Sequence, residues 1–440
     1  MSATLTTSYL SADRSEPVLE TTVGDALRRT AAEHPERTAL IEGSPDPGSR
    51  QHWTYGELVS DAERVARALL ARFSPGEHVA VWAPNSAAWV LLEYGAALAG
   101  LTLVTVNPAL KESEVEYALG QSRAAGVFYL PEYRGTSLAS IIESVRPRLP
   151  GLREAISLLN WDTFLESARP DQPLPQVSPD DIVQIQYTSG TTGFPKGALL
   201  HHRGLTNNAR LFARRLGAGP GDVWLNAMPL FHTAGCVMNT LGSLQTGGAN
   251  LIVPGFEPGL VLELIESEAA TYGTLVPTML LALLAHPAFP STRRETLRAL
   301  VTGGAPVNSE LVRRVEGAFG IPLTSVYAQT EASPVITQTR TEDTPAERET
   351  CGRPLPQTEV KIVEPGKTEP VAVGTVGEIC ARGYQVMRGY FNMPEQSAAA
   401  IDREGWLHTG DLGRLDAHGV LHFAGRLKDM IIRGDRKSVV

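Results

Sequence analysis

Along the chain, segments whose apolar residues have the spacing of a helix alternate with segments whose apolar residues have the spacing of a strand. One stretch carries its apolar residues at steps of four, three and four: Leu58, Ala62, Val65 and Leu69. That spacing predicts one buried face of a helix, and residues 54–57, TYGE, have the spacing of a capping box at its start. Residues 78–82 predict a short buried strand. Helices and strands of this kind alternate to about Phe319, which is typical of an α/β protein with parallel sheets covered by helices.

The pattern changes after about Gly320. Glycine, proline and threonine there separate short predicted strands at residues 359–363, 377–381 and 420–423. We therefore expect α/β subdomains over residues 21–320, a smaller β-rich, barrel-like subdomain over residues 321–427 and a disordered tail over residues 1–20. The longest apolar run, residues 89–106, is interrupted by Glu93, Gly95 and Gly100. It predicts a buried helix, a turn and a strand rather than a membrane span.

Composition narrows the class of protein. With 440 residues, 42% of them hydrophobic and 20% charged, the chain is expected to fold into two or three subdomains. A net charge of −9 argues against nucleic acid as a partner, because binding phosphates needs clustered Lys and Arg. Cys236, Cys351 and Cys380 are far apart, which predicts neither a zinc site nor a disulfide framework. The polar N-terminus lacks the pattern that predicts a signal peptide, and we expect a cytoplasmic protein.

Residues 187–197, YTSGTTGFPKG, are the most informative stretch, and they follow an apolar strand predicted at residues 181–186. Small residues in succession let backbone N–H groups converge on an anion, and a lysine adds a charge for a polyphosphate. The candidate phosphate-binding residues are Thr188, Ser189, Gly190, Thr191, Thr192, Gly193 and Lys196. A Walker-type loop is excluded because it needs glycine before the lysine and Ser or Thr after it. A flexible surface loop is the alternative, and the adjoining buried strand disfavours it.

This loop resembles the signature of the adenylate-forming (AMP-binding) superfamily, which includes acyl-CoA synthetases, aryl-CoA ligases, luciferases and the adenylation domains of peptide synthetases. The resemblance extends from about Thr22 to Gly434. It implies two helix-covered, mainly parallel sheets plus the smaller barrel-like subdomain. It also implies ATP, Mg²⁺, coenzyme A and a small carboxylic acid as cofactors and substrates, and it leaves a homodimer open.

Further motifs of the family supply the rest of a nucleotide site. The resemblance implies that Gly303, Gly304, Ala305 and Pro306 line one face of the adenine. It implies that Tyr327 stacks on the other face, that Thr330 bonds the α-phosphate and that Glu331 holds magnesium, a metal that prefers carboxylate and phosphate oxygens. Taken alone, Glu331 would more often be a solvated surface charge. Asp411 is expected to accept from the ribose hydroxyls and Arg426 to contact ribose and phosphate. We interpret two further matching segments, around Glu378 and Tyr390, as mainly structural.

Residues 229–235, PLFHTAG, resemble the motif that borders the acyl pocket, with Phe231, His232 and Gly235 as its lining. Alone, His232 would more often be a satisfied, partly buried histidine. Amino-acid-activating relatives carry an acidic residue directly after this phenylalanine, and His232 stands there instead. We therefore expect a neutral-tailed acid, with a fatty acid first and an aryl acid second. An adenylate-binding module without full catalysis and a ligase that uses a carrier-protein thiol remain alternatives.

The end of the chain departs from the family pattern. Residues 425–434, GRLKDMIIRG, keep the hinge motif, and DRKSVV follows. The relatives continue into a small C-terminal domain that carries a catalytic lysine, so we expect residues 428–440 to be a hinge with an aberrant end. We expect this chain to bind ATP or an acyl-adenylate and to be nearly inert in the overall ligation. A natural truncation and a DNA-sequencing artefact both remain open.

Overall fold

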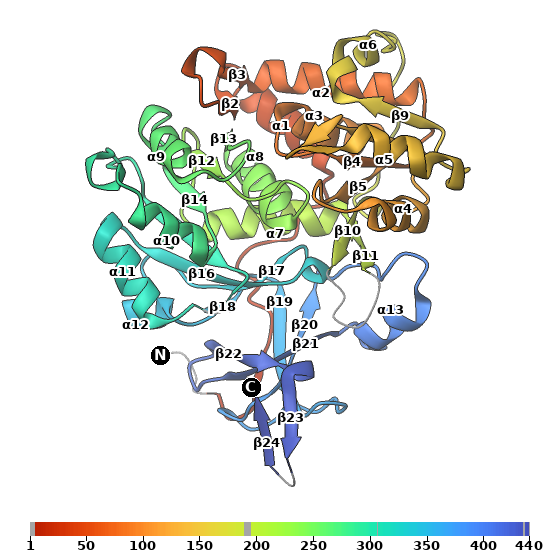
Figure 1. The fold of residues 1–440 in the computed structure, drawn as a ribbon. Helices are drawn as coiled ribbons and strands as arrows, with labels where there is room; N and C mark the ends of the chain where they lie inside the picture. The colour runs from red at the N-terminus through yellow and green to blue at the C-terminus, as the bar shows by residue number, and fades with distance from the viewer. Residues whose placement is uncertain (1–4, 189–194, 306, 434–435, 440) are drawn as a thin grey trace.

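The computed structural model describes residues 5–188, 195–305, 307–433 and 436–439, and of residues 429–439 it describes the backbone alone. Two large sheets form the upper part of the molecule (Figure 1). The six-stranded sheet has the order β11 (Lys196–His201), β10 (Ile182–Thr188), β5 (Thr102–Val106), β4 (His78–Trp82), β6 (Gly126–Tyr129) and β9 (Glu154–Ser157). Its strands are parallel except for β11, which pairs antiparallel with β10.

The nine-stranded sheet has parallel strands at its centre and antiparallel strands at both edges. Its order is β18 (Arg353–Pro354), β17 (Val335–Gln338), β16 (Leu323–Ala328), β15 (Ala299–Gly303), β14 (Tyr272–Thr274), β12 (Val223–Asn226), β13 (Ala249–Ile252), β2 (Thr38–Glu42) and β3 (Gln51–Thr54). The α/β fold with two mainly parallel sheets is thus confirmed. The large sheet runs on to Pro354, so its strands end well past residue 320, where the sequence suggested the change of subdomain.

Alternating residues of the central strands face different helical layers, as expected of sheets buried on both faces. Val79 and Val81 pack toward α1 (Val23–Glu33), α2 (Tyr55–Leu70) and α3 (Ala87–Leu98), whereas Ala80 and Trp82 pack on α4 (Glu112–Gln121) and α5 (Leu138–Val145). The first of these cores also contains Leu40 of the nine-stranded sheet. Helices α1–α3 therefore fill the space between the two sheets. The outer face of the nine-stranded sheet is covered by α9 (Pro258–Ser267), α10 (Pro277–Ala285) and α11 (Ser309–Phe319).

The expected helix starts and strands are largely confirmed. Helix α2 opens on a capping box in which Thr54 and Glu57 satisfy each other's backbone N–H groups. Residues 89–106 form most of α3, a turn at Gly100, where φ is +67°, and β5. Among the described residues, no helix combines the length and the apolar character that crossing a bilayer requires.

The β-rich part is a five-stranded antiparallel sheet at the lower end of the molecule (Figure 1). Its order is β1 (Tyr9–Leu10), β19 (Thr358–Val363), β20 (Gly377–Gly383), β21 (Leu407–Leu415) and β22 (Leu421–Arg426). No pairing joins β1 to β22 within the described part of the chain, so the sheet is open rather than closed like a barrel. Helix α13 (Pro394–Ala400) lies between β20 and β21 in the sequence.

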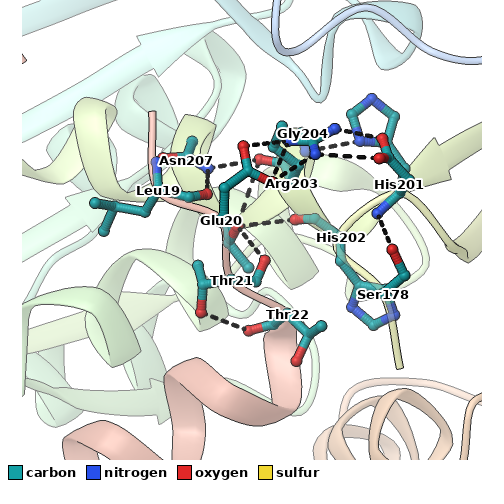
Figure 2. Close-up of polar contacts among 12 residues, drawn as sticks. Leu19, Glu20, Thr21, Thr22, Ser178, His201, His202, Arg203, Gly204 and Asn207 are labelled. Carbon is teal, nitrogen blue, oxygen red and sulfur yellow. Dashed lines mark hydrogen bonds and ion pairs between the residues drawn. The ribbon is translucent and has the colours of Figure 1, made fainter. Parts of the chain in front are cut away.

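Residues 5–20 do not form the disordered tail that their polar sequence suggested. Strand β1 is an edge of the five-stranded sheet, and the segment then runs along α7 (His202–Arg215), as Figure 2 shows. Leu19 exchanges two backbone hydrogen bonds with the side-chain amide of Asn207, at 2.7 and 2.9 Å. Glu20 forms an ion pair with Arg203 at 2.6 Å. The segment is held by partners almost two hundred residues away, which no local pattern reveals.

Candidate active site

The base of the proposed phosphate loop is a cross-strand pair. Thr188, the last residue of β10, lies opposite Lys196, the first residue of β11, and its hydroxyl approaches the Lys196 carbonyl at 3.5 Å. Strand β10 is buried in the six-stranded sheet, which fixes its position. Thr188 and Lys196 therefore lie side by side at the same end of β10 and β11. Ser189, Gly190, Thr191, Thr192 and Gly193 lie outside the described residues.

Lys196 and Glu331 meet at Tyr390. The Lys196 Nζ lies 4.2 Å from the centroid of the Tyr390 ring, and the Tyr390 hydroxyl donates to Oε1 of Glu331 at 2.7 Å. Glu331 belongs to a single 3₁₀ turn, Thr330–Ala332, just after β16. Among the described residues, Oε2 of Glu331 and the Thr330 hydroxyl have no hydrogen-bond partner, so both remain free for a ligand. Burial and the neighbouring Glu331 carboxylate raise the pKa of Tyr390, which keeps its hydroxyl protonated.

A second cluster surrounds Asp411. The Tyr327 hydroxyl donates to Oδ2 of Asp411 at 2.9 Å, and the Gln329 side chain donates to the same oxygen at 2.8 Å. Arg426 lies opposite Asp411 on β22, with its Nε 3.6 Å from Oδ1. Burial and the Asp411 charge raise the pKa of Tyr327, so it stays a donor. Carboxylate and guanidinium groups next to an aromatic ring are suited to hold a ribose, a phosphate and a flat base.

The glycine pair after β15 is open on one side. Gly303 has no room for a side chain, because a Cβ there would lie 2.8 Å from the carbonyl oxygen of Val326 on β16. Gly304 has φ of +75° and nothing within 4 Å of such a Cβ, so a ligand could approach the backbone closely. Ala305 is exposed. Pro306 lies outside the described residues.

The expected acyl motif leads into a π-helix, residues Ala234–Leu241, that packs against β12. Nδ1 of His232 accepts from the backbone N–H of Ala234 at 3.1 Å, which leaves the proton of the neutral imidazole on Nε2. Its side chain is exposed, yet surrounding protein atoms lower its pKa by desolvation. Phe231 is half-buried. Gly235 is buried, and a Cβ there would lie 2.3 Å from the carbonyl oxygen of Pro229, so it permits the tight turn.

Apolar side chains connect this segment to the nucleotide motif. Ala328, which stands between Tyr327 and Gln329, packs on one cluster that contains Met228, Ala234, Met238, Val276 and Met279. Gln186 on β10 also donates to Sγ of Cys236 in the π-helix at 3.0 Å. The acyl motif therefore lies beside both the phosphate-loop strand and the Tyr327 motif.

Sequence reasoning missed two members of these clusters. The sequence alone assigns no role to Gln329 and suggests a mainly structural role for the segment around Tyr390. Their sequence signal was present, since both lie within segments that match the family. Neither contact follows from local spacing, because Tyr390 reaches Glu331 across 59 positions.

A third polar group lies on the neighbouring strands. Nδ1 of His408 is 3.1 Å from Oε2 of Glu378 and 3.5 Å from Sγ of Cys380. Hydrogen bonds that His408 donates to Cys380 and Glu378 raise its pKa to about 10. The second oxygen of Glu378 accepts from the backbone N–H of Gly410, one residue before Asp411, so this group supports the ribose-side strand.

Comparison with known proteins agrees with this arrangement. The family model for AMP-binding enzymes matches residues 27–391. An acyl-CoA synthetase by name, YngI of Bacillus subtilis (strain 168), is 38% identical over 95% of this chain and 81% of its own length. The human mitochondrial medium-chain acyl-CoA ligase ACSF2 is 33% identical over 94% of this chain and 72% of its own length.

Solved structures share the fold of the chain. The anthranilate CoA ligase AuaEII in complex with anthranoyl-AMP superposes with a TM-score of 0.87 at 26% identity, covering 96% of this chain and 80% of that one. The inhibitor-bound N-terminal domain of FACL13 from Mycobacterium tuberculosis is covered completely, with a TM-score of 0.84 at 29% identity over 93% of this chain. The chain belongs to the AMP-binding enzyme family, among the AMP-forming acyl-CoA synthetases and ligases. Enzymes of this class activate a carboxylic acid with ATP and pass it to CoA.

Proposed function

We propose that the protein activates a fatty acid as an acyl-adenylate and transfers the acyl group to coenzyme A. The observation that carries the proposal is the convergence of four separate motifs on two adjoining clusters, Lys196 with Glu331 through Tyr390, and Tyr327 with Asp411 and Arg426. Their charges match the parts of ATP. A lysine and a carboxylate with a free oxygen suit a metal-bound triphosphate, and a carboxylate beside an aromatic ring suits an adenosine.

In the first step, a carboxylate oxygen of the acid attacks the α-phosphorus of ATP, the bond to the β-phosphate oxygen breaks and pyrophosphate leaves. In the second, the thiolate of CoA attacks the acyl carbon and AMP leaves. The protein needs no nucleophile of its own in either step. Lys196, Thr330, Arg426 and the loop amides would position the phosphates and stabilise the charge that builds up on their oxygens. Asp411 and Tyr327 would hold the nucleoside.

Magnesium fits the donor set of this site. Oε2 of Glu331 has no partner among the described residues, and a carboxylate oxygen beside phosphate oxygens is the environment that Mg²⁺ prefers. When bound, the ion would neutralise charge on the phosphates of ATP. The chain's own contribution would be to hold that carboxylate in place.

The fatty-acid assignment rests on the surroundings of His232. The imidazole is neutral, and the side chains that cluster with nearby Ala234, namely Met228, Met238, Val276 and Met279, are apolar. Transfer of an alkyl tail from water to such apolar surroundings has no free-energy cost. An ammonium group would lack a carboxylate partner there. Aryl acids remain the second candidate class.

Pyrophosphate release is the direct test. The chain, extended with the C-terminal domain of a relative, is incubated with ATP, Mg²⁺ and a panel of fatty, aryl and amino acids, and CoA consumption is followed in parallel. Release that depends on a fatty acid supports the proposal. ATP binding without release for any acid indicates an adenylate-binding module, and release without CoA consumption indicates another thiol acceptor.

A further inference from the structure

Tyr390 contacts both residues that the proposed function assigns to the metal and the phosphates. Its hydroxyl donates to Oε1 of Glu331 at 2.7 Å, and its ring faces Nζ of Lys196 at 4.2 Å from the centroid. The tyrosine is only 7% exposed, whereas its two neighbours are partly open to solvent. One buried aromatic side chain therefore separates and supports two groups of opposite charge.

The backbone fixes this tyrosine relative to the phosphate-loop strand. Tyr390 forms an antiparallel bridge with Ala198 on β11, and the N–H groups on either side of it, of Arg388 and Phe391, donate to the carbonyls of Leu199 and Gly197 at 2.9 and 2.8 Å. Its own N–H donates to Oγ of Ser397 on α13 at 2.8 Å. The ring is thus positioned from two sides, which is the arrangement needed to orient other side chains.

We propose that Tyr390 is a positioning residue that aims the Glu331 carboxylate at the metal ion and the Lys196 ammonium at the triphosphate. This inference rests on the proposed function of the site. The hydroxyl occupies one carboxylate oxygen and leaves Oε2 for the metal, as outer-shell donors do for metal-binding carboxylates. The ring attracts the ammonium through its π face without neutralising it, so the full positive charge stays available for phosphate. No ion pair joins Lys196 to Glu331 in the described structure; each of the two contacts Tyr390 instead.

Two substitutions separate the two contacts. Tyr390→Phe removes the donor to Glu331 and keeps the ring beneath Lys196, whereas Tyr390→Leu removes both. Tyr55→Phe is a matched control, because the Tyr55 hydroxyl is also buried and donates to Gly248 O at 2.7 Å but lies in α2, outside the site. The readout is ATP binding by calorimetry over a range of Mg²⁺ concentrations, with the 440-residue protein and without any acid.

We expect Tyr390→Phe to raise the Mg²⁺ concentration for half-maximal ATP binding by about 10-fold, as loss of an outer-shell partner does. Metal-free ATP binding should be unchanged in Tyr390→Phe and several-fold weaker in Tyr390→Leu. On a Glu331→Gln background, Tyr390→Phe should shift the Mg²⁺ dependence no further, because its effect acts through Glu331.

Three results would overturn the inference. One is a wild-type Mg²⁺ dependence in Tyr390→Phe. Another is an equal weakening of ATP binding by Tyr390→Phe with and without Mg²⁺, together with a lowered Tm. That pattern would indicate a purely structural loss, like the loss of a buried hydrogen bond in Tyr55→Phe. A third, absence of ATP binding by the wild-type protein, would remove the proposed function as well, and so differs from a failure of Tyr390 alone.

Discussion

Glu331 and Asp411 each have one carboxylate oxygen that accepts hydrogen bonds from protein groups and a second oxygen that accepts none from the described part of the chain. A ligand can bind to that second oxygen. We predict that Glu331→Ala and Asp411→Ala each slow adenylate formation roughly 10²–10³-fold, because charge stabilisation by a fixed group is lost in the transition state. Lys196→Ala should have a milder effect, since a partly exposed lysine is less rigidly held. Acid-dependent pyrophosphate release by the chain extended with the C-terminal domain of a relative measures this, with Glu310→Ala, an exposed residue at the start of α11, as control. Near-normal rates in both carboxylate variants would remove these residues from the site.

His232 permits a test of substrate class at the same scale. His232→Asp should weaken binding of a fatty acyl-adenylate analogue by about 10–100-fold, because a charged carboxylate beside an apolar tail must be desolvated. His232→Asn is the matched control, since its side-chain oxygen can still accept from the Ala234 N–H that now binds Nδ1. Affinity for a non-reactive fatty acyl-sulfamoyl adenosine, measured by calorimetry, needs no turnover. Equal affinities in both variants would place His232 outside the acyl pocket.

At the scale of single elements, the N-terminus of α7 depends on two neutral histidines. Nδ1 of His201 caps the helix by accepting from Gly204 N–H at 3.1 Å (Figure 2). Nδ1 of His202 accepts from Val23 N–H at the start of α1, also at 3.1 Å. Burial lowers the pKa of each to about 4. The unfolded chain therefore binds protons below its pKa of about 6.5 while the folded chain does not, so stability falls as pH drops from 6.5 toward 4.

We expect each of these histidines to lower the free energy of unfolding by about 2 kcal/mol between pH 7 and pH 5. His202→Asn keeps an acceptor near the position of Nδ1 and cannot titrate, so it should flatten part of the acid slope. Urea unfolding at pH 5, 6 and 7 measures the difference between the variant and the wild type. An unchanged slope in His202→Asn would contradict the assignment of the slope to this residue.

How far the sequence predicts an element depends on where its partners lie. Strand β4, helix α2 and the strand that delivers Thr188 follow from apolar period and capping, because each is specified by residues within one or two turns or along one strand. Strand β1 has two residues and no period, and its partner is β19, about 350 positions away. The same holds for Tyr390, which contacts Lys196 and Glu331 from two other motifs. Motif residues could thus be named from the sequence, but the side chains that orient them could not.

At the scale of the whole molecule, a buried polar chain crosses from one sheet to the other. Glu93 on α3 is 1% exposed, and its Oε1 accepts from Gln184 at 2.8 Å. Gln184 in turn accepts from Gln186 at 2.8 Å, and Gln186 donates to Cys236 in the π-helix that packs on the nine-stranded sheet. Oε2 of Glu93 has no partner in the described structure, and burial raises its pKa well above the usual value.

This carboxyl group makes stability fall as pH rises. Above the unfolded pKa of about 4.3, the unfolded chain loses the proton that the folded chain retains, which costs about 1.4 kcal/mol per pH unit until the folded pKa is reached. Glu93→Gln keeps the acceptor for Gln184 and carries no titrating proton, so its stability relative to the wild type should increase steadily from pH 5 to pH 8. Urea unfolding at three pH values tests this, with Glu143→Gln, an exposed residue of α5, as the control. Parallel curves for Glu93→Gln and the wild type would show that Glu93 does not retain a proton on folding. A rising difference would show that the contact between the two sheets depends on a neutral carboxyl group.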